Sequence, residues 1–571
     1  MPLHYRCLAL LRRLLPFLQR RPPHMAVLRS DVIAGLTVGL VLIPQALAYA
    51  QLAGMPAVTG LYAALLPGVV GALFGSSALL AVDPVALSSL LTFAALQPLA
   101  VPASNEWVTL AIWLAIYSGL FQFLLGAFRL GVLANLVSNA VIKGFVTAAA
   151  IIIALSQLPA LLGQTHLWGL GWSSLPLQGW LDLEAALSAA AVGLGAVAAL
   201  LACKHYLPRL PGIMLVCLGA LMLSQYLGFA ERGGAVVGEI VGGLPQPSLP
   251  ATLSLETHLR LLLPALVIAL LSFTEAMASC RTVARATHEP WSTNQELLGQ
   301  GLAKIASGLC GSFPVSGSFS RTALNVYSGA RTRCATLVAS TVVLCCLIGF
   351  TGILYHLPKA VLAAIIIVPV WRLIDLKGIR RLLHDNPRDG LVALATLITT
   401  LLSGPHLYWG VIVGLALSLS LFLARHVAPR IVEVSLHESG ALRDRHLYDL
   451  PPIAGHVLAV RMDASLTYLT APVLEAYIRR RLGADHAITS VLVCASALNQ
   501  IDSTGLDTLR DLHQLLAAQG IALYLSSAKR PVREALHRSG LLAELGERRL
   551  FATDLQALEH LACPEPHLAA I

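Results

Sequence analysis

The stretch DVIAGLTVGLVLIPQALAYAQLAGMPAVTGLYAALLPGVVGALFGSS, residues 31–77, decides the fold. It contains two apolar runs, 31–52 and 57–75, each close to the roughly 20 residues that a helix needs to cross a bilayer. The whole chain of 571 residues is 56% hydrophobic and only 12% charged, where an average soluble domain carries about 25% charged residues. This composition excludes a cytosolic globular protein, a disordered protein and a disulfide-stapled secreted protein. It predicts a helical membrane protein with many spans.

We expect the basic stretch 1–30 to be a cytoplasmic N-terminal segment. Apolar segments follow it and continue to about residue 428. Two further segments, 84–96 and 316–328, are shorter and more polar, and with them the count is fourteen. The twelve longer segments lie near 31–52, 57–75, 107–128, 131–156, 185–203, 211–229, 258–280, 295–312, 331–355, 358–374, 389–403 and 407–427.

The charges of the loops support an even number of segments, which places both ends of the chain on one side of the membrane. The loops 97–106 and 159–183 contain no Lys or Arg. Because cytoplasmic loops are enriched in these residues, the asymmetry predicts a cytoplasmic (inner) membrane protein with both termini in the cytoplasm. The basic residues follow even-numbered segments: Arg129, Lys204, Arg209, Arg281, Arg285, Arg331, Arg333, Lys377, Arg380, Arg381 and Arg388.

After a boundary near 430–445 the density of charge becomes that of a soluble domain. Expected strands at 456–464, 488–495 and 521–528 alternate with expected helices at 470–482, 504–520 and 529–541, which indicates a small α/β domain over 445–565. The ten cysteines show no metal-ligand spacing, so we expect no metal and no cofactor. No basic stripe is interleaved with aromatic residues, so nucleic acid is not an expected partner.

A faint internal repeat relates the two halves of the membrane part, 31–229 and 258–428. IPQALAYA at 43–50 resembles FTEAMASC at 273–280, with Gln45 opposite Glu275, and PVALS at 84–88 precedes PVSGS at 314–318 by the same interval. Seven segments per half make the halves inverted, an arrangement that in transporters places the binding site at the repeat interface. The alternative is chance similarity between alanine-rich helices.

The two short segments, within 75–91 and 311–325, are expected to be half-helices that begin inside the membrane. The N-terminus of a helix offers unpaired backbone N–H groups and the positive end of its dipole, so two such ends facing each other can hold an anion. The alternative is a pair of packed helices kinked by proline and glycine.

Few charged residues lie within the predicted spans. Arg321 is expected to attract an anion through its positive charge. The alternatives are that Arg321 forms a structural pair with Glu275 or that it extends to the membrane interface. Glu275 is a candidate site for a proton or sodium ion, with a purely structural role as the alternative, and Ser279 shares its helical face. Four residues are predicted nearer segment ends, with their charged groups extending toward water: Lys143, Lys304, Arg372 and Asp375.

Three stretches resemble one family in the correct order. Residues 31–77 and NQELLGQGLAKIASGLCGSFPVSGSFSRTALNVYSGART at 294–332 resemble the signatures of the SulP family, the bacterial sulfate permeases and their eukaryotic anion-transporter relatives. IDSTGLDTL at 501–509 is similar to the central motif of the STAS domain that ends these chains. The resemblance covers residues 31–565.

The resemblance implies an all-helical fold of fourteen segments in a 7+7 inverted repeat, with core and gate domains like those of nucleobase transporters, and a cytoplasmic STAS domain. It implies a homodimer formed through membrane and STAS contacts. The anion would lie between the third and tenth segments. Site residues implied by the family motifs are Gln45, Tyr49, Val85, Phe319, Ser320 and Arg321 for the substrate, and Glu275 with Ser279 for the coupling ion.

Two positions need separate comment. The family usually has Gly where this chain has Asp83, and a carboxylate beside an anion site repels the substrate unless it is protonated or paired. In related stand-alone STAS domains a serine of the motif is phosphorylated; Ser503, preceded by Asp502, holds that place. The alternative is that Asp502 or Ser503 only caps the following helix.

We therefore expect a secondary active transporter of inorganic anions, sulfate above all, that works by alternating access with a proton or sodium ion coupled through Glu275. It is not expected to be an enzyme. The alternatives are a bicarbonate or dicarboxylate transporter or an uncoupled anion channel of the same fold. A nucleobase–proton symporter and a signalling protein anchored by its membrane part are further rivals.

The topology is testable with a reporter fused after residue 430. Because the loop charges place both ends in the cytoplasm, a reporter that works only in the cytoplasm should be active there, and one that works only in the periplasm should be inactive. Paired cytoplasmic and periplasmic reporters at the same position make the measurement. Activity of the periplasmic type would overturn the count of fourteen.

Overall fold

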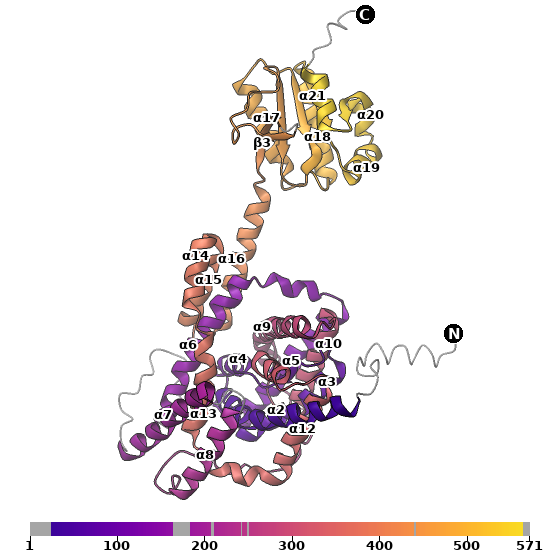
Figure 1. The fold of residues 1–571 in the computed structure, drawn as a ribbon. Helices are drawn as coiled ribbons and strands as arrows, with labels where there is room; N and C mark the ends of the chain where they lie inside the picture. Colours follow the sequence, from indigo (N-terminus) through magenta and orange to yellow (C-terminus); the bar gives the residue numbers. More distant parts are fainter. Residues whose placement is uncertain are drawn as a thin grey trace, which may run out of the picture. The chain divides into compact units, whose positions relative to one another are not determined.

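The computed structural model describes residues 24–163, 183–206, 211–240, 242–247, 250–438 and 441–562 (Figure 1). Within the chain, contacts define two compact units, Met1–Ser418 and Leu419–Ile571. Most of the predicted N-terminal segment, most of the loop 159–183, and Arg209 lie outside the described residues.

A helix occurs at each of the fourteen segments predicted from the sequence. Eight helical stretches among the described residues are long and apolar enough to cross a membrane; the count of fourteen spans stays a prediction. The helices are α2 (Met25–Leu52), α3 (Ala57–Phe74), α4 (Ala86–Leu96), α5 (Asn105–Ala127), α6 (Asn139–Leu161), α7 (Leu183–Tyr206), α8 (Gly212–Tyr226), α9 (Leu255–Thr287), α10 (Thr293–Leu309), α11 (Phe319–Tyr327), α12 (Cys334–Cys345), α13 (Lys359–Val370), α15 (Pro387–Leu402) and α16 (Tyr408–Val427).

The two short helices, α4 and α11, each begin directly after a short strand. Strand β1 (Ala81–Asp83) pairs antiparallel with β2 (Ser316–Ser318), with Ala81 opposite Ser318 and Asp83 opposite Ser316. All six strand residues are buried. An unpaired backbone group in an apolar interior is costly, and this ladder pairs backbone groups of the non-helical residues that precede the half-helices. The half-helices expected within 75–91 and 311–325 therefore begin next to each other.

Helix α5 packs against α9 and α10, which lie beside it in Figure 1, and α9 also contacts the ladder through β2. Helix α10 approaches α5 closely because both present glycine at the crossing. A Cβ atom added to Gly301 would lie 2.6 Å from the backbone nitrogen of Phe123 and 2.7 Å from the carbonyl oxygen of Gly119. No larger residue fits there without moving a helix.

Three details differ from the prediction. The segment expected at 131–156 starts as a 3₁₀ turn, Gly131–Leu136, and α6 begins only after Ser138, whose hydroxyl accepts from the N–H of Val141. The segment 331–355 ends in a π turn and a 3₁₀ turn after α12. Helix α14 (Leu376–Asp385) was not predicted, because its polar face breaks the apolar run.

Lys143 and Asp375 were expected to extend toward water from near segment ends, and a pairing between them was not expected. Their side chains form an ion pair of 2.9 Å, both partly exposed. Asp375 also caps α14 by accepting from the N–H of Gly378. The hydrogen bond from Lys143 lowers the pKa of Asp375, and the bond from Gly378 adds to this effect. Arg372 is exposed.

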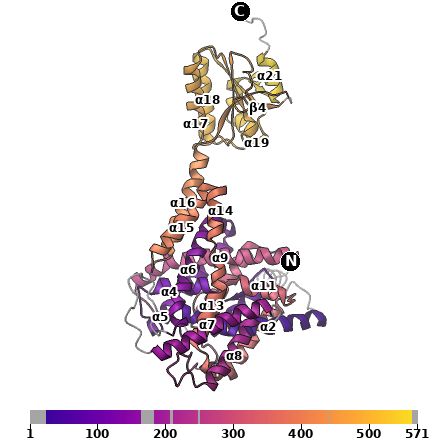
Figure 2. The ribbon, with the colours of Figure 1, turned by 60° about the vertical axis from the view of Figure 1, so that its left-hand side comes forward.

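The second unit has a six-stranded sheet of order β4-β3-β5-β6-β7-β8. Strands β5 to β8 are parallel, and β3 runs antiparallel to β4 and β5. Helices α17 and α18 cover one face and α21 the other, as Figure 2 shows. The strands are β3 (Ile431–Leu436), β4 (Leu442–Asp444), β5 (Val457–Met462), β6 (Ser490–Cys494), β7 (Ala522–Ser526) and β8 (Leu550–Phe551). The helices are α17 (Ala471–Ala484), α18 (Ser503–Ala518), α19 (Arg530–Arg538), α20 (Leu541–Leu545) and α21 (Asp554–Ala562).

The three strands and three helices expected in this unit are all present, at β5, β6 and β7 and at α17, α18 and α19. Strands β3, β4 and β8 and helices α20 and α21 were not predicted. Strand β3 lies within the boundary region predicted at 430–445 and belongs to the sheet, because it pairs with β5 through Ile431, Val432 and Glu433.

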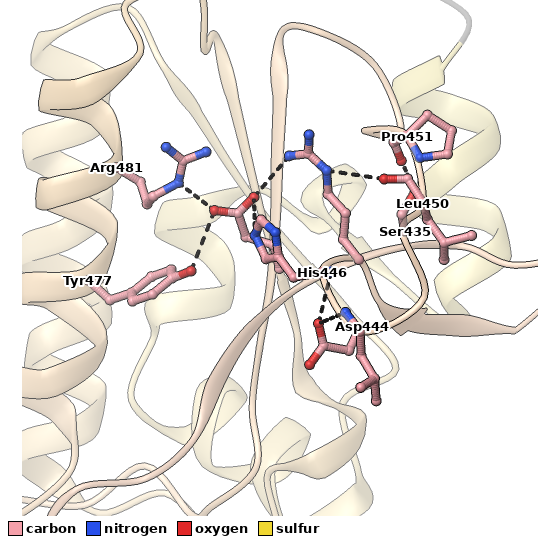
Figure 3. A network of polar contacts seen from close by, with 10 residues as sticks. Ser435, Asp444, His446, Leu450, Pro451, Tyr477 and Arg481 are labelled. Carbon is pink, nitrogen blue, oxygen red and sulfur yellow. Dashed lines mark hydrogen bonds and ion pairs between the residues drawn. The ribbon is translucent and has the colours of Figure 1, made fainter.

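A buried carboxylate joins β3 to the surrounding elements (Figure 3). Glu433 is only 5% exposed. Its two oxygens accept from Arg481 of α17, from Arg445 at 3.1 Å and from the Tyr477 hydroxyl at 3.4 Å. Burial raises the pKa of Tyr477, and the neighbouring carboxylate of Glu433 adds to the shift. The carboxylate thus ties the first strand of the unit to its first helix.

Replacing Glu433 by Gln should destabilise the second unit, because Arg445 and Arg481 then keep charges without their partner. Breaking a buried ion pair typically costs about 3 kcal/mol. The measurement is thermal unfolding of the full chain in detergent, with proteolysis of the second unit as a second probe. Glu544→Gln is the control, since the partly exposed pair of Arg510 and Glu544 should contribute less than about 1 kcal/mol. Equal effects of the two substitutions would contradict this role of Glu433.

Candidate functional site

The first unit contains a cavity of about 630 Å³. The first residues of both short helices border it: Val85, Ala86 and Leu87 at α4, and Ser318, Phe319 and Ser320 at α11. Its other walls come from α2, α6, α9 and the end of α13. Two helix N-termini thus reach one cavity, with Ser320 supplying a hydroxyl.

Five of the eight site residues expected from the sequence line this cavity. They are Tyr49, Val85, Glu275, Phe319 and Ser320. Gln45, Ser279 and Arg321 are buried beside the cavity but are not among its lining residues. The roles of all eight in binding stay predictions.

Arg321 is 1% exposed and is held by protein groups. Its Nε donates to Asp83 Oδ2 at 2.7 Å, and its Nη1 donates to Gln45 Oε1 at 2.7 Å. Its Nη2 donates to the other oxygen of Asp83 and to the carbonyl oxygen of Pro84. The guanidinium also lies over the Tyr49 ring, 5.6 Å from its centre. The structural partner of Arg321 is therefore Asp83 rather than Glu275.

This pair also settles the position of Asp83, which departs from the usual family pattern. The carboxylate is 3% exposed, faces Arg321 and is not among the residues that line the cavity. The two charges neutralise each other at the point where β1 leads into α4 and β2 into α11. The cavity between the helix ends is thereby spared the repulsion of a free carboxylate.

Glu275 lies on α9 and lines the cavity. Its Oε2 has no hydrogen-bond partner among the described residues. Ser279 donates its hydroxyl to the backbone carbonyl oxygen of Glu275 at 3.1 Å and is fully buried, so the helix itself satisfies that hydroxyl. The free carboxylate oxygen is an acceptor available to a proton or a cation.

Lys304 was expected to extend toward water from near a segment end, and this expectation is wrong. The side chain is 0% exposed and its ammonium donates to Ser272 Oγ on α9. Ser272 also accepts from Gln122 Nε2 of α5 at 3.1 Å. Ser272 precedes Glu275 by less than one helical turn, and the ammonium and the carboxylate attract each other. Lys304 is therefore a buried basic side chain close to Glu275, which sequence reasoning missed.

Sequence reasoning also missed five polar residues of the cavity wall: Ser138, Asn139, Thr274, Arg281 and Ser318. Ser138 and Asn139 open α6, and a capping serine before an apolar run was a signal for that helix start. Thr274 and Arg281 lie on one side of α9, because they are seven residues, or about two turns, apart, and this spacing is visible in the sequence.

In the second unit, Asp502 caps α18. Its Oδ1 accepts from the N–H of Gly505 and its Oδ2 from the N–H of Tyr468, both at 2.8 Å. Ser503 is the first helical residue and is exposed. The capping role is thus filled by Asp502; a regulatory role for either residue stays a prediction.

Comparison with known proteins gives a consistent result over most of the chain. Residues 28–396 match the sulfate permease family and residues 451–557 match the STAS domain. The chain is 34% identical over 543 residues to a probable sulfate transporter of Mycobacterium tuberculosis, which covers 92% of this chain and 94% of that protein. It is 31% identical over 551 residues to probable sulfate transporter 4.2 of Arabidopsis thaliana, covering 92% of this chain and 79% of that protein.

Two solved structures resemble the fold. The murine Solute Carrier 26 family member A9 anion transporter, solved in the inward-facing state, matches with a TM-score of 0.86 at 21% identity, covering 97% of this chain and 94% of that chain. The transmembrane domain of a cyanobacterial bicarbonate transporter matches with a TM-score of 0.57 at 26% identity, covering 69% of this chain and 98% of that chain. The predicted fold class, a helical transporter followed by a STAS domain, is confirmed.

The pair of Asp83 and Arg321 can be tested with a double-mutant cycle. Arg321→Met leaves a buried carboxylate without its partner and should cost about 3–5 kcal/mol of unfolding free energy, whereas adding Asp83→Asn removes the lone charge. The double variant should therefore be more stable than Arg321→Met, as measured by thermal unfolding in detergent.

The control cycle uses Lys143→Met and Asp375→Asn, whose ion pair is partly exposed and should show coupling below about 1 kcal/mol. If the effects of Asp83→Asn and Arg321→Met simply add, the two side chains do not stabilise the fold as a pair.

Proposed function

The chain belongs to the sulfate permease family, and from that premise we propose that it moves inorganic anions, sulfate first among them, across the cytoplasmic membrane by secondary active transport. The family and the relatives are transporters and not enzymes, which confirms the prediction of transport rather than catalysis. The substrate, its coupling and the membrane orientation are the parts that we propose.

The observation that carries the proposal is the meeting of two helix N-termini at one cavity. Backbone N–H groups and the positive dipole ends of α4 and α11 favour an anion there, and the Ser320 hydroxyl adds a neutral donor. Because Arg321 is neutralised by Asp83, this site would hold the anion mainly by dipoles and hydrogen bonds. Such a site suits a small oxyanion whose oxygens accept from several directions.

We propose that Glu275 carries the coupling ion. Glu275 lines the same cavity and has a buried carboxylate oxygen without a partner among the described residues, so a bound proton or sodium ion would lie near the anion. The amine of Lys304 lies close to this carboxylate, and a positive charge there opposes a bound proton and a bound sodium ion alike, so the coupling ion is either of the two.

Further parts of the proposal concern assembly and orientation. We place both termini in the cytoplasm on the basis of loop charge, and we expect a homodimer through membrane and STAS contacts. Exposed Ser503, at the start of α18, remains the candidate for regulation by phosphorylation, since a phosphate would sit at a helix N-terminus.

The experiment is uptake of labelled sulfate into proteoliposomes with a proton gradient, a sodium gradient or neither. We expect accumulation with an inward proton gradient or an inward sodium gradient, and competition by unlabelled sulfate exceeding that by bicarbonate or dicarboxylates. If bicarbonate or a dicarboxylate competes better than sulfate, that anion and not sulfate is the substrate. Rapid uptake that no gradient accelerates would favour an uncoupled channel.

Glu275→Gln should abolish gradient-driven accumulation but spare exchange of one anion for another. The amide imitates a permanently protonated side chain of the same size, while the helix-end site is unchanged. The two activities are measured as uptake and counterflow in the same vesicles. Loss of both with intact folding would make Glu275 a substrate-site or structural residue. Full retention of driven uptake would remove it from coupling.

A further inference from the structure

Two charged residues are found among the described residues that line the cavity, Glu275 and Arg281. Asp83, Lys304 and Arg321 are buried around it and engaged with protein groups. We propose that Arg281 is the cation that draws the anion into this cavity and sets its affinity. This inference rests on the proposed function and names a residue for the same site.

The placement of Arg281 follows from the geometry of α9. Residues Thr274, Met277, Ala278 and Arg281 all line the cavity, and they form one stripe along the helix at intervals of three and four. Six residues separate Glu275 from Arg281, a rise of about 9 Å along the axis. The stripe thus begins beside Glu275 and ends at Arg281, whose side chain is exposed to solvent.

The guanidinium of Arg281 is available to a ligand. Within the part of the chain that the structure describes, no hydrogen bond or ion pair engages it, in contrast to Arg321, whose donors are occupied by Asp83, Gln45 and Pro84. A planar guanidinium can donate two parallel hydrogen bonds to an oxyanion. Arg281 is therefore the free cation of this cavity wall.

The surroundings make this charge effective. The cavity wall is mostly aliphatic, with residues such as Ile142, Val146, Ile153 and Leu271. Low-dielectric walls focus the field of a charge and raise the local concentration of a ligand of opposite sign. A charge at the exposed end of the stripe would attract the anion first, before the helix ends of α4 and α11 bind it.

Helix α9 offers a matched control. Arg285 lies one turn beyond Arg281, is also exposed and does not line the cavity. Arg281→Gln and Arg285→Gln remove the same charge from the same helix and differ in whether that charge faces the cavity. Arg281→Lys keeps the charge without the planar fork.

The experiment measures sulfate binding to the purified protein and the KM of sulfate uptake in proteoliposomes, with folding checked by gel filtration. Arg281→Gln should weaken binding and raise KM about 10-fold with Vmax changed less than about two-fold, because it removes an attraction on entry. Arg281→Lys should recover most of the loss. Arg285→Gln should behave as the unmodified protein, and raising the ionic strength should weaken binding more in the unmodified protein than in Arg281→Gln.

If Arg281→Gln and Arg285→Gln bind and transport sulfate alike, the proposal for Arg281 is wrong. An equal rise of KM in both would assign the effect to the general positive potential of this end of α9 and would equally overturn it. Failure of the unmodified protein to move sulfate is a different result, because it would reject the proposed function itself.

Discussion

The antiparallel pairing of β1 with β2 is the constraint on which the membrane unit depends. Chain that is not helical within an apolar interior must pair its backbone groups, and here six residues from distant parts of the sequence do so with one another. Once the ladder forms, α4 and α11 start beside each other. The N-termini of both helices then lie at one cavity. The register, with Asp83 opposite Ser316, brings the side chain of Asp83 to Arg321. The anion site is thus a consequence of how the backbone is satisfied.

The buried charges are then divided between structure and cavity. Asp83 and Arg321 neutralise each other, and Gln45 and Pro84 take further donors of the guanidinium. An ion pair of this kind adds specificity to the junction of the two half-helices, because the loss of either member leaves an uncompensated charge. Lys304 is held by Ser272 between α9 and α10. Among the described residues, the charged side chains that line the cavity are Glu275 and Arg281, both on α9.

Much of this could be predicted from the sequence, since local signals mark it. Prolines 84 and 314 and the serines near them indicated the half-helices, and alternating strand and helix patterns predicted the centre of the STAS domain. The partner of Arg321 could not be predicted, because Asp83 is 238 residues away and only the strand register brings the two together. The burial of Lys304 was equally hidden: nothing local distinguishes a lysine that faces two packed helices from one that faces water. The late start of α6 and the existence of α14 depended on capping by Ser138 and Asp375, which a search for apolar runs passes over.

The two halves of the membrane unit also show how a repeat can acquire different roles at corresponding positions. Gln45 on α2 and Glu275 on α9 occupy matching places in the sequence repeat. The amide oxygen of Gln45 accepts from Arg321 and so belongs to the junction of the half-helices. Glu275 faces the cavity with an unpartnered oxygen and has Lys304 nearby. A carboxylate at residue 45 would add a second negative charge to the pair of Asp83 and Arg321, and an amide at residue 275 would leave the cavity without an acid. The neutral Gln45 therefore lies where the charges of Asp83 and Arg321 already balance. The ionisable Glu275 lies at the cavity, where the gain or loss of one proton alters the net charge that an entering anion meets.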